Sequence, residues 1–177
     1  MADLKITGLT EDTAPTTDDL VVTVNDPAGT PANRKVTLAN LTKGLGGAWT
    51  PWTPTYANLT VGNGTHNSKY VQIGKTVIAR FEFTFGSTSA MGTGPTGTLP
   101  VTAVSVGAGT VYGPVMINDP GVAQYAGSLQ PSTTTIVLFY LHGTAGTYAN
   151  IANITSTAPM TWATGDILSA IAIYEAA

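Results

Sequence analysis

Apolar and polar residues alternate one by one along much of the chain, a pattern typical of β-strands with one buried face. The clearest case is residues 76–85 (TVIARFEFTF), where every second position from Val77 to Phe85 is apolar. Residues 69–73 (KYVQI) precede this stretch across Gly74 and Lys75. A two-residue connection of this kind predicts a β-hairpin.

Further strands are expected at residues 56–61, 110–117, 122–129, 134–141 and 167–174, separated by clusters of Gly, Pro and Asn. No convincing helical period occurs among them. The Gly-rich residues 92–95 (GTGP) lack the lysine and helix that follow in a phosphate-binding loop, so we expect only a loop there. Short strands at this spacing predict a mainly β domain over residues 55–177, built as a sandwich or a barrel.

Two of the expected strands are apolar on both alternating faces: residues 134–141 (TTIVLFYL) and 166–175 (DILSAIAIYE). A strand of a single solvated sandwich should have one polar face. Since no helix is predicted to cover the outer side, another subunit is the simplest cover. The residues expected at this subunit interface are Ile136, Leu138, Phe139, Ile167, Ile171, Ile173 and Tyr174.

Residues 1–45 predict a separate hairpin followed by a short helix. The strands are expected at residues 20–24 (LVVTV) and 34–37, joined by the turn-rich segment NDPAGTP. Thr37 can cap a helix that ends at the glycines near residue 46. Such a unit has little core, so its apolar residues require a neighbouring copy, another protein or the main body as a partner. The residues expected to serve attachment are Leu20, Val22, Val24, Val36, Leu38, Leu41 and Leu45.

Residues 46–54 (GGAWTPWTP) are expected to form a linker between the two parts. Glycines leave its direction free, whereas the two prolines stiffen it. Trp49 and Trp52 can each bury a large area, so we expect them to pack against the body or a neighbouring subunit. Stacking on carbohydrate is the alternative role for these two rings.

Charge is distributed unevenly, because ten of the seventeen Asp, Glu, Lys and Arg residues lie within the first 43 positions. Charged residues make up 10% of the chain, against about 25% in ordinary globular proteins. An apolar content of 43% and a net charge of −3 favour a folded body. Interface cores are depleted of charge, so the neutral body favours self-association over a monomer with a solvated Thr-rich surface.

Several protein classes are disfavoured by what the sequence lacks. With no cysteine, thiol nucleophiles, disulfides and the usual structural zinc sites are excluded. No apolar run approaches the ~20 residues of a membrane span, and the acidic, polar residues 1–15 do not resemble a signal peptide. A pI near 5.1 without a basic patch makes nucleic acid an unexpected partner.

Catalytic chemistry has few candidates. His66 and His142 are the only histidines, and neither has a second ligand at metal-binding spacing, so no metal and no cofactor is expected. Arg80 and Glu82 are two residues apart on one strand face and are interpreted as an ion pair. No G-x-S-x-G motif occurs. The acids of the body are scattered without a specific spacing: Glu82, Asp119, Asp166 and Glu175. We therefore expect no enzyme.

Longer motifs resemble proteins of tailed bacteriophages. The leader is similar to an N-terminal module of phage fibre and other virion surface proteins, with the pattern I-x-x-L at residues 6–9, A-P-x-x-D-D-L at 14–20 and K-V-T-L-A-N-L at 35–41. The body is similar to phage heads with W-T-P-T-Y-x-N-L-T-V-G-N-G-T at residues 52–65 and K-Y-x-Q-I-G-K-T-V at 69–77. The ending W-x-x-G-D-x-L…Y matches residues 162–174.

This resemblance implies a homotrimer of jelly-roll-like antiparallel β-sandwich heads, docked on another virion protein, of the capsid or the tail, through residues 1–45. It implies a non-enzymatic structural protein of the virion, assembled in the bacterial host cytoplasm, as a head fibre, a decoration protein or a short tail spike. A tail-tip receptor-binding protein is the alternative, recognising host surface glycan. The aromatic residues considered for that role are Trp49, Trp52, Tyr112, Tyr125 and Tyr148. A depolymerase is the third hypothesis and would need two of the acids in one cleft.

Overall fold

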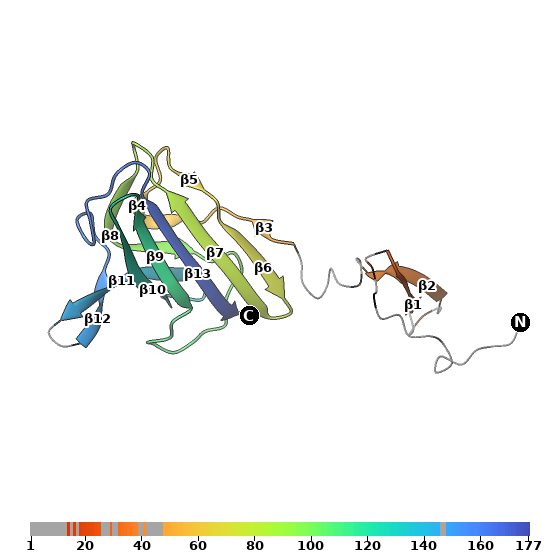
Figure 1. The fold of residues 1–177 in the computed structure, drawn as a ribbon. Coiled ribbons are helices and arrows are strands. Elements are labelled where there is room, and N and C mark those ends of the chain that lie inside the picture. The colour runs from red at the N-terminus through yellow and green to blue at the C-terminus, as the bar shows by residue number, and fades with distance from the viewer. Residues whose placement is uncertain are drawn as a thin grey trace, which may run out of the picture. The chain divides into compact units, whose positions relative to one another are not determined.

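The computed structural model describes residues 14, 16, 18–25, 29, 32–38, 41, 48–145 and 148–177, without the side chains of 24, 25, 32, 33, 144, 145, 148 and 149. The chain divides into two compact units, Met1–Gly46 and Gly47–Ala177 (Figure 1). Each unit has its own β-sheet. We describe the units separately and call the second one the head.

The first unit contains an antiparallel hairpin of β1 (Leu20–Asn25) and β2 (Ala32–Thr37). Its register runs from Leu20 opposite Thr37 to Asn25 opposite Ala32. The two strands expected in this region are thus confirmed, with β2 beginning two residues earlier than the sequence predicts. Most of the short helix expected after Thr37 falls outside the described residues, and it stays a prediction.

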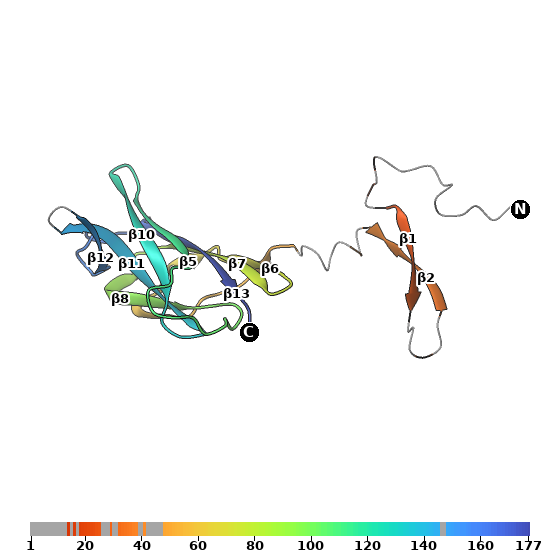
Figure 2. The ribbon, with the colours of Figure 1, turned by 90° about the horizontal axis from the view of Figure 1, so that it is seen from below.

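The head is one curled antiparallel sheet, which confirms the expected mainly β fold (Figures 1 and 2). Its strands along the chain are β3 (Thr50–Pro51), β4 (Tyr56–Thr60), β5 (Thr65–His66), β6 (Lys69–Ile73), β7 (Thr76–Thr84), β8 (Ala90–Thr98), β9 (Gly113–Asp119), β10 (Ala123–Pro131), β11 (Ile136–Ala145), β12 (Tyr148–Asn153) and β13 (Ile167–Glu175). The order across the sheet is β3-β6-β7-β13-β9-β10-β11-β8-β4, with β12 paired to β11 and β5 to β7.

The hairpin of β6 and β7 forms as its alternation predicts. Ile73 lies opposite Thr76, and Gly74 supplies the positive φ of 59° that the tight turn requires. Every second side chain of β7 from Val77 to Phe83 is buried, as is Phe85 directly after the strand. Strict apolar alternation therefore identified both the strand and its inward face.

Aromatic rings fill the core where the curled sheet folds over itself. Phe81 of β7 meets Phe139 of β11 edge to face, with ring centroids 5.3 Å apart. Trp52 packs edge-on against Phe81 at 4.9 Å, and Tyr56 of β4 lies between Phe83 and Phe139. Such edge-to-face pairs add to the stabilisation from burial alone. These contacts join opposite parts of the sheet into one hydrophobic core.

Two local expectations are corrected by the structure. Residues 92–95 are not a loop, because they lie inside β8, between β4 and β11 in the sheet. The glycines of this strand serve packing: a Cβ on Gly97 would approach the rings of Phe139, Phe81 and Tyr56 to 3.1–3.3 Å. Part of the expected linker also belongs to the head, since Thr50 of β3 pairs with Tyr70 of β6.

Strand β13 occupies the middle of the sheet, paired with β7 on one side and β9 on the other. Its side chains alternate between the two faces of the sheet. Leu168, Ala170, Ala172 and Tyr174 point into the core and are buried. The opposite face of β13 carries the other half of its apolar residues, and this face positions the candidate site.

Candidate functional site

The two histidines lie in different surroundings and do not form a common site. His66 is in β5 and stacks on Tyr56, with ring centroids 5.6 Å apart and planes within 10° of parallel. His142 is exposed on β11. Across the described ranges, no group of three or more His, Asp or Glu side chains is placed to hold a metal ion.

Burial governs the ionisation of the His66–Tyr56 pair. It lowers the pKa of His66 and strongly raises the pKa of Tyr56, whose hydrogen bond to Ser68 opposes this shift only in part. The His66 Nδ1 atom is buried without a hydrogen-bond partner. Both rings are therefore neutral near pH 7, and their arrangement is that of packed aromatic groups.

Two of the four acids of the head have local structural partners. Asp166 is buried and accepts a 2.6 Å hydrogen bond from the Ala163 N–H, which fixes the turn before β13. Glu82 accepts from the Asn67 side-chain amide at 2.9 Å. Asp119 ends β9 next to the start of β13, since Asn118 pairs with Ile167, whereas Glu175 is exposed at the far end of β13.

The aromatic residues considered for glycan binding are mostly packed. Trp52 lies on Phe81, and Tyr112 is buried against Tyr174 at a centroid distance of 5.3 Å. Tyr125 is half-buried against the core. Trp49 is exposed, and the structure does not describe the side chain of Tyr148. These positions do not assemble into a described aromatic platform.

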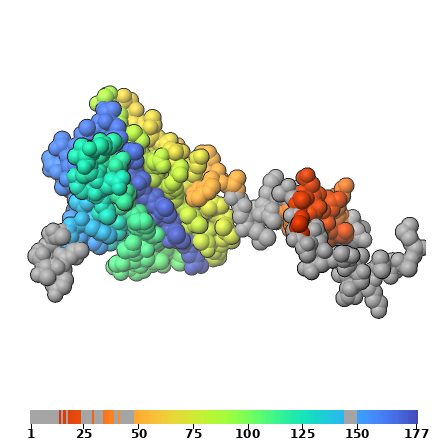
Figure 3. All heavy atoms as spheres, viewed as in Figure 1, coloured from red at the N-terminus to blue at the C-terminus, as the bar shows by residue number. Residues whose placement is uncertain are grey.

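The most distinctive surface of the head is the outer face of four neighbouring strands, β6, β7, β13 and β9. Ile171 is 44% exposed, Ile173 56% and Met116 42%. Directly paired residues of antiparallel strands share a face, so the register places further apolar side chains beside them. We call this surface the outer face, and its members are Lys69, Val71, Ile73, Ile78, Arg80, Glu82, Pro114, Met116, Ser169, Ile171, Ile173 and Glu175. It is turned toward the viewer in Figures 1 and 3.

A shallow depression of about 260 Å³ lies in this outer face, between β7, β13 and β9. Its floor and walls are largely apolar, with Met116 and Ile171 on two sides. Arg80 and Glu82 form its polar border, with Arg80 Nε 3.7 Å from Glu82 Oε2. This distance is an electrostatic contact rather than a hydrogen bond. Arg80 Nη2 also donates to the Asn67 carbonyl at 3.1 Å, which holds the guanidinium against the sheet.

The residues expected at a subunit interface separate into two groups. Ile171 and Ile173 are exposed, and Ile167 is half-buried on the same side of β13. Ile136 and Leu138 of β11 are half-buried. By contrast, Phe139 and Tyr174 are buried in the core of this chain, because their inward faces meet Phe81 and Tyr112. Those last two are core residues, which differs from their expected place at an interface.

Sequence reasoning missed the contributions of β6, β7 and β9 to the outer face. Val71 lies opposite Ile78, which in turn lies opposite Ile173, and together they form an apolar row across three strands. Met116 lies opposite Ser169. Alternation alone does not show which way these residues face, and only the register and the strand order place them on one surface.

The hairpin of the first unit exposes apolar residues as well. Leu20 and Val22 are exposed, with Val22 73% accessible, and Leu41 is exposed too. Val36 and Leu38 are half-buried. Leu45 and the side chain of Val24 lie outside what the structure describes.

None of the described helical segments is long and apolar enough to cross a membrane. Comparison with known proteins gives no match to any family model, curated protein or solved structure.

Proposed function

We propose that this chain is a non-enzymatic structural protein of a tailed-phage virion. In this proposal the head is a jelly-roll-like β-sandwich that assembles as a homotrimer. The first unit attaches the assembly to a capsid or tail protein. The motifs in residues 6–41, 52–65, 69–77 and 162–174, which resemble phage virion surface proteins, support the phage assignment.

The observation that carries the proposal is the apolar outer face of the head. Ile171, Ile173 and Met116 are each more than two-fifths exposed on adjacent or neighbouring strands. A contiguous apolar surface of this kind is typical of a protein–protein contact. Self-association would bury it, and the low charge of the head is consistent with such an interface.

The first unit supports an attachment role by its small size. A single two-stranded hairpin is marginally stable in water. Its exposed Leu20 and Val22 gain stability when another surface covers them. A virion protein that binds this hairpin would therefore order it at the same time.

Receptor binding through glycan is less well supported. Of the aromatic side chains considered for that role, only Trp49 is exposed among those described, whereas Trp52, Tyr112 and Tyr125 are wholly or partly buried. Catalysis is not proposed, because Glu82 is the only acid among the described residues that line the depression, and it is paired with Arg80.

A virion reconstruction combined with a deletion tests the proposal. The full chain should run as a trimer in sedimentation analysis and should be found in several copies on the particle. Particles lacking the protein should break at a lower temperature but adsorb to host cells normally. Normal particle stability with lost adsorption would instead favour the receptor-binding function, and a monomer at all concentrations would exclude the trimer.

A further inference from the structure

The outer face has a regular arrangement of apolar rows and charged corners. Across β6, β7 and β13, Val71, Ile78 and Ile173 form the central apolar row, in which Val71 is buried, Ile78 half-buried and Ile173 exposed. The next row holds Lys69, Arg80 and Ile171. On the other side of the central row, Thr76 pairs with both Ile73 and Glu175. The apolar centre is thus flanked by a positive row at one end and a carboxylate at the other.

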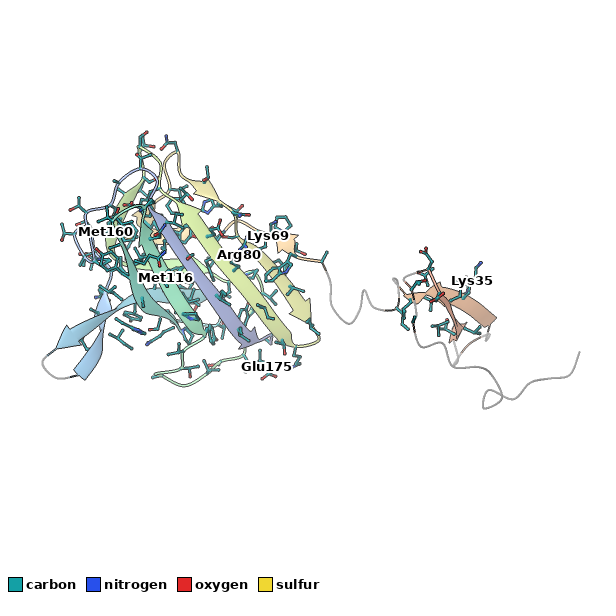
Figure 4. The ribbon with its side chains drawn as sticks, viewed as in Figure 1. Lys35, Lys69, Arg80, Met116, Met160 and Glu175 are labelled. Atoms are coloured by element: carbon teal, nitrogen blue, oxygen red, sulfur yellow. The ribbon has the colours of Figure 1, made fainter. Side chains whose placement is uncertain are left out.

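Two of the charges on this face neutralise one another, and two do not. Arg80 and Glu82 form the only ion pair among the described residues. Lys69 and Glu175 have no oppositely charged partner there. The rows of Lys69 and Glu175 are four residues apart along β7, so the two backbones are offset by about 13 Å along the strands. Their strands, β6 and β13, are two strand spacings apart, which is about 10 Å across the sheet. Figure 4 shows Lys69 and Glu175 on either side of this surface.

This pattern is complementary to itself. The face carries two positive and two negative side chains, so it is neutral as a whole. The face therefore offers no electrostatic complementarity to a strongly charged partner. A second copy, whose face overlaps only one side of the first, can cover the isoleucines and bring its Glu175 to the unpaired Lys69, while the Glu175 of the first copy stays free for a third copy. Repulsion between like charges would disfavour a copy in the opposite orientation.

We infer that the outer face of β6, β7, β13 and β9 binds a second copy of this chain, with Lys69 of one copy paired to Glu175 of the next. Ile171 and Ile173 lie at the centre of the contact, and the depression beside Met116 receives an apolar side chain of the neighbour. The Lys69–Glu175 pair sets the direction of assembly. A head-to-tail contact of this kind closes into a ring when the rotation between copies allows it.

This inference rests on the self-association in the proposed function, but it specifies one surface and one pair. The half-buried Ile136 and Leu138 lie on β11, which is separated from β9 by β10 and is not a strand of the outer face. The contact is therefore centred on β13 alone, although the sequence made both strands candidates.

Cross-linking tests the pair directly, because the chain contains no cysteine. The variant carrying both Lys69→Cys and Glu175→Cys, in the full chain, is treated with a short bismaleimide and run on a denaturing gel. The separation of the two positions within one copy is too great for a short linker, so products should be covalent dimers and trimers. Either single variant carries one thiol per copy and cannot exceed a dimer. Assembled protein that gives no product above the dimer in the double variant would overturn the pairing.

Charge reversal provides an independent measurement. Lys69→Glu and Glu175→Lys should each weaken assembly roughly tenfold in sedimentation equilibrium, and the double reversal should restore most of the loss. If the double reversal instead weakened assembly by the sum of the two single effects, the pairing of Lys69 with Glu175 would be wrong. Unchanged melting of the monomer in each variant shows that the fold is intact.

A third variant tests the apolar centre and separates the two proposals. Ile173→Asp should abolish assembly, whereas Val122→Asp, on the exposed turn between β9 and β10, should leave it unchanged. If the unaltered chain is a monomer, the proposed self-association itself is wrong. If it assembles and Ile173→Asp assembles equally well, only the assignment of this face is wrong.

Discussion

The phenol of Tyr174 binds both backbone groups of Val101. Its O–H donates to the Val101 carbonyl at 2.9 Å, and its oxygen accepts from the Val101 N–H at 3.3 Å. Tyr174 ends the inward face of β13, so these bonds fasten the segment after β8 to the central strand. A side chain expected at a subunit interface thus holds two distant parts of one chain together.

Tyr174→Phe should destabilise the head by about 1–2 kcal/mol, because both backbone groups of Val101 lose their partner while the ring remains packed. Thermal or urea unfolding of the full chain measures this. Tyr125→Phe is the matched control, since Tyr125 is half-buried against the core and has no hydrogen bond to Val101. A Tyr174→Phe protein as stable as the original would show that these bonds contribute nothing.

Stability should fall at high pH. Burial raises the pKa of Tyr174 to about 12 from its ordinary value of 10.0. The folded protein therefore keeps a proton that the unfolded chain releases, and this contribution is complete below pH 10 and lost as pH rises toward 12. Burial also raises the pKa of Tyr112. The free energy of unfolding, measured from pH 8 to pH 12, should decline less steeply in Tyr174→Phe than in the original protein. An identical decline would contradict this role of Tyr174.

Acid should destabilise the head through His66. Burial lowers its pKa from 6.5, so the folded state disfavours the proton that the unfolded chain binds. This contribution is complete above pH 6.5 and decreases as pH falls below it. The melting temperature should drop between pH 7.5 and pH 5, and His66→Gln should reduce the drop. His142→Gln, at an exposed position on β11, should show the original dependence.

Gly127→Ala should prevent the head from folding. A methyl group at Gly127 would overlap the backbone carbonyl of Tyr140, where β10 pairs with β11. Neither backbone can move without breaking the ladder. Gly107→Ala is the control, because a Cβ there meets nothing within 4 Å. Soluble yield and circular dichroism distinguish the two, and a folded Gly127→Ala protein would show that the sheet can shift at this point.

A core substitution tests the closure of the sheet. Phe139→Ala removes the ring that meets both Phe81 and Tyr56, and large-to-small changes of this kind cost about 3–5 kcal/mol. Ile136→Ala, on the same strand but half-buried, should cost clearly less. Equal losses in denaturant unfolding would mean that the aromatic contact across the sheet is not a main source of stability.

The sequence predicts the strands of the head where alternation is strong. Residues 76–84 form β7 with the expected inward face, and the hairpin with β6 follows from its short turn. Strand β8 could not be found this way, because Gly92, Gly94 and Gly97 have low strand preference. The backbone of Asn58 approaches Gly92, aromatic rings approach Gly97, and Gly94 has a positive φ of 62°; these causes are visible only in the folded chain.

The candidate surface was predictable in part. The two apolar faces of residues 166–175 correctly indicated that β13 is buried on one side and apolar on the other. Periodicity could not identify the strands beside β13, because pairing between distant segments depends on how the whole sheet closes. The outer face required Val71, Ile78 and Met116 to be placed next to Ile173 and Ile171, and only the register shows this.

The central place of β13 has a consequence for synthesis on the ribosome. Strands β7 and β9 precede it by many residues, yet they are joined only through it. Until residues 167–175 have left the exit tunnel, each of those strands presents an unpaired edge, a form prone to mispairing with other chains. The head therefore completes its sheet late, and a chain interrupted before residue 167 would leave two open edges at its centre.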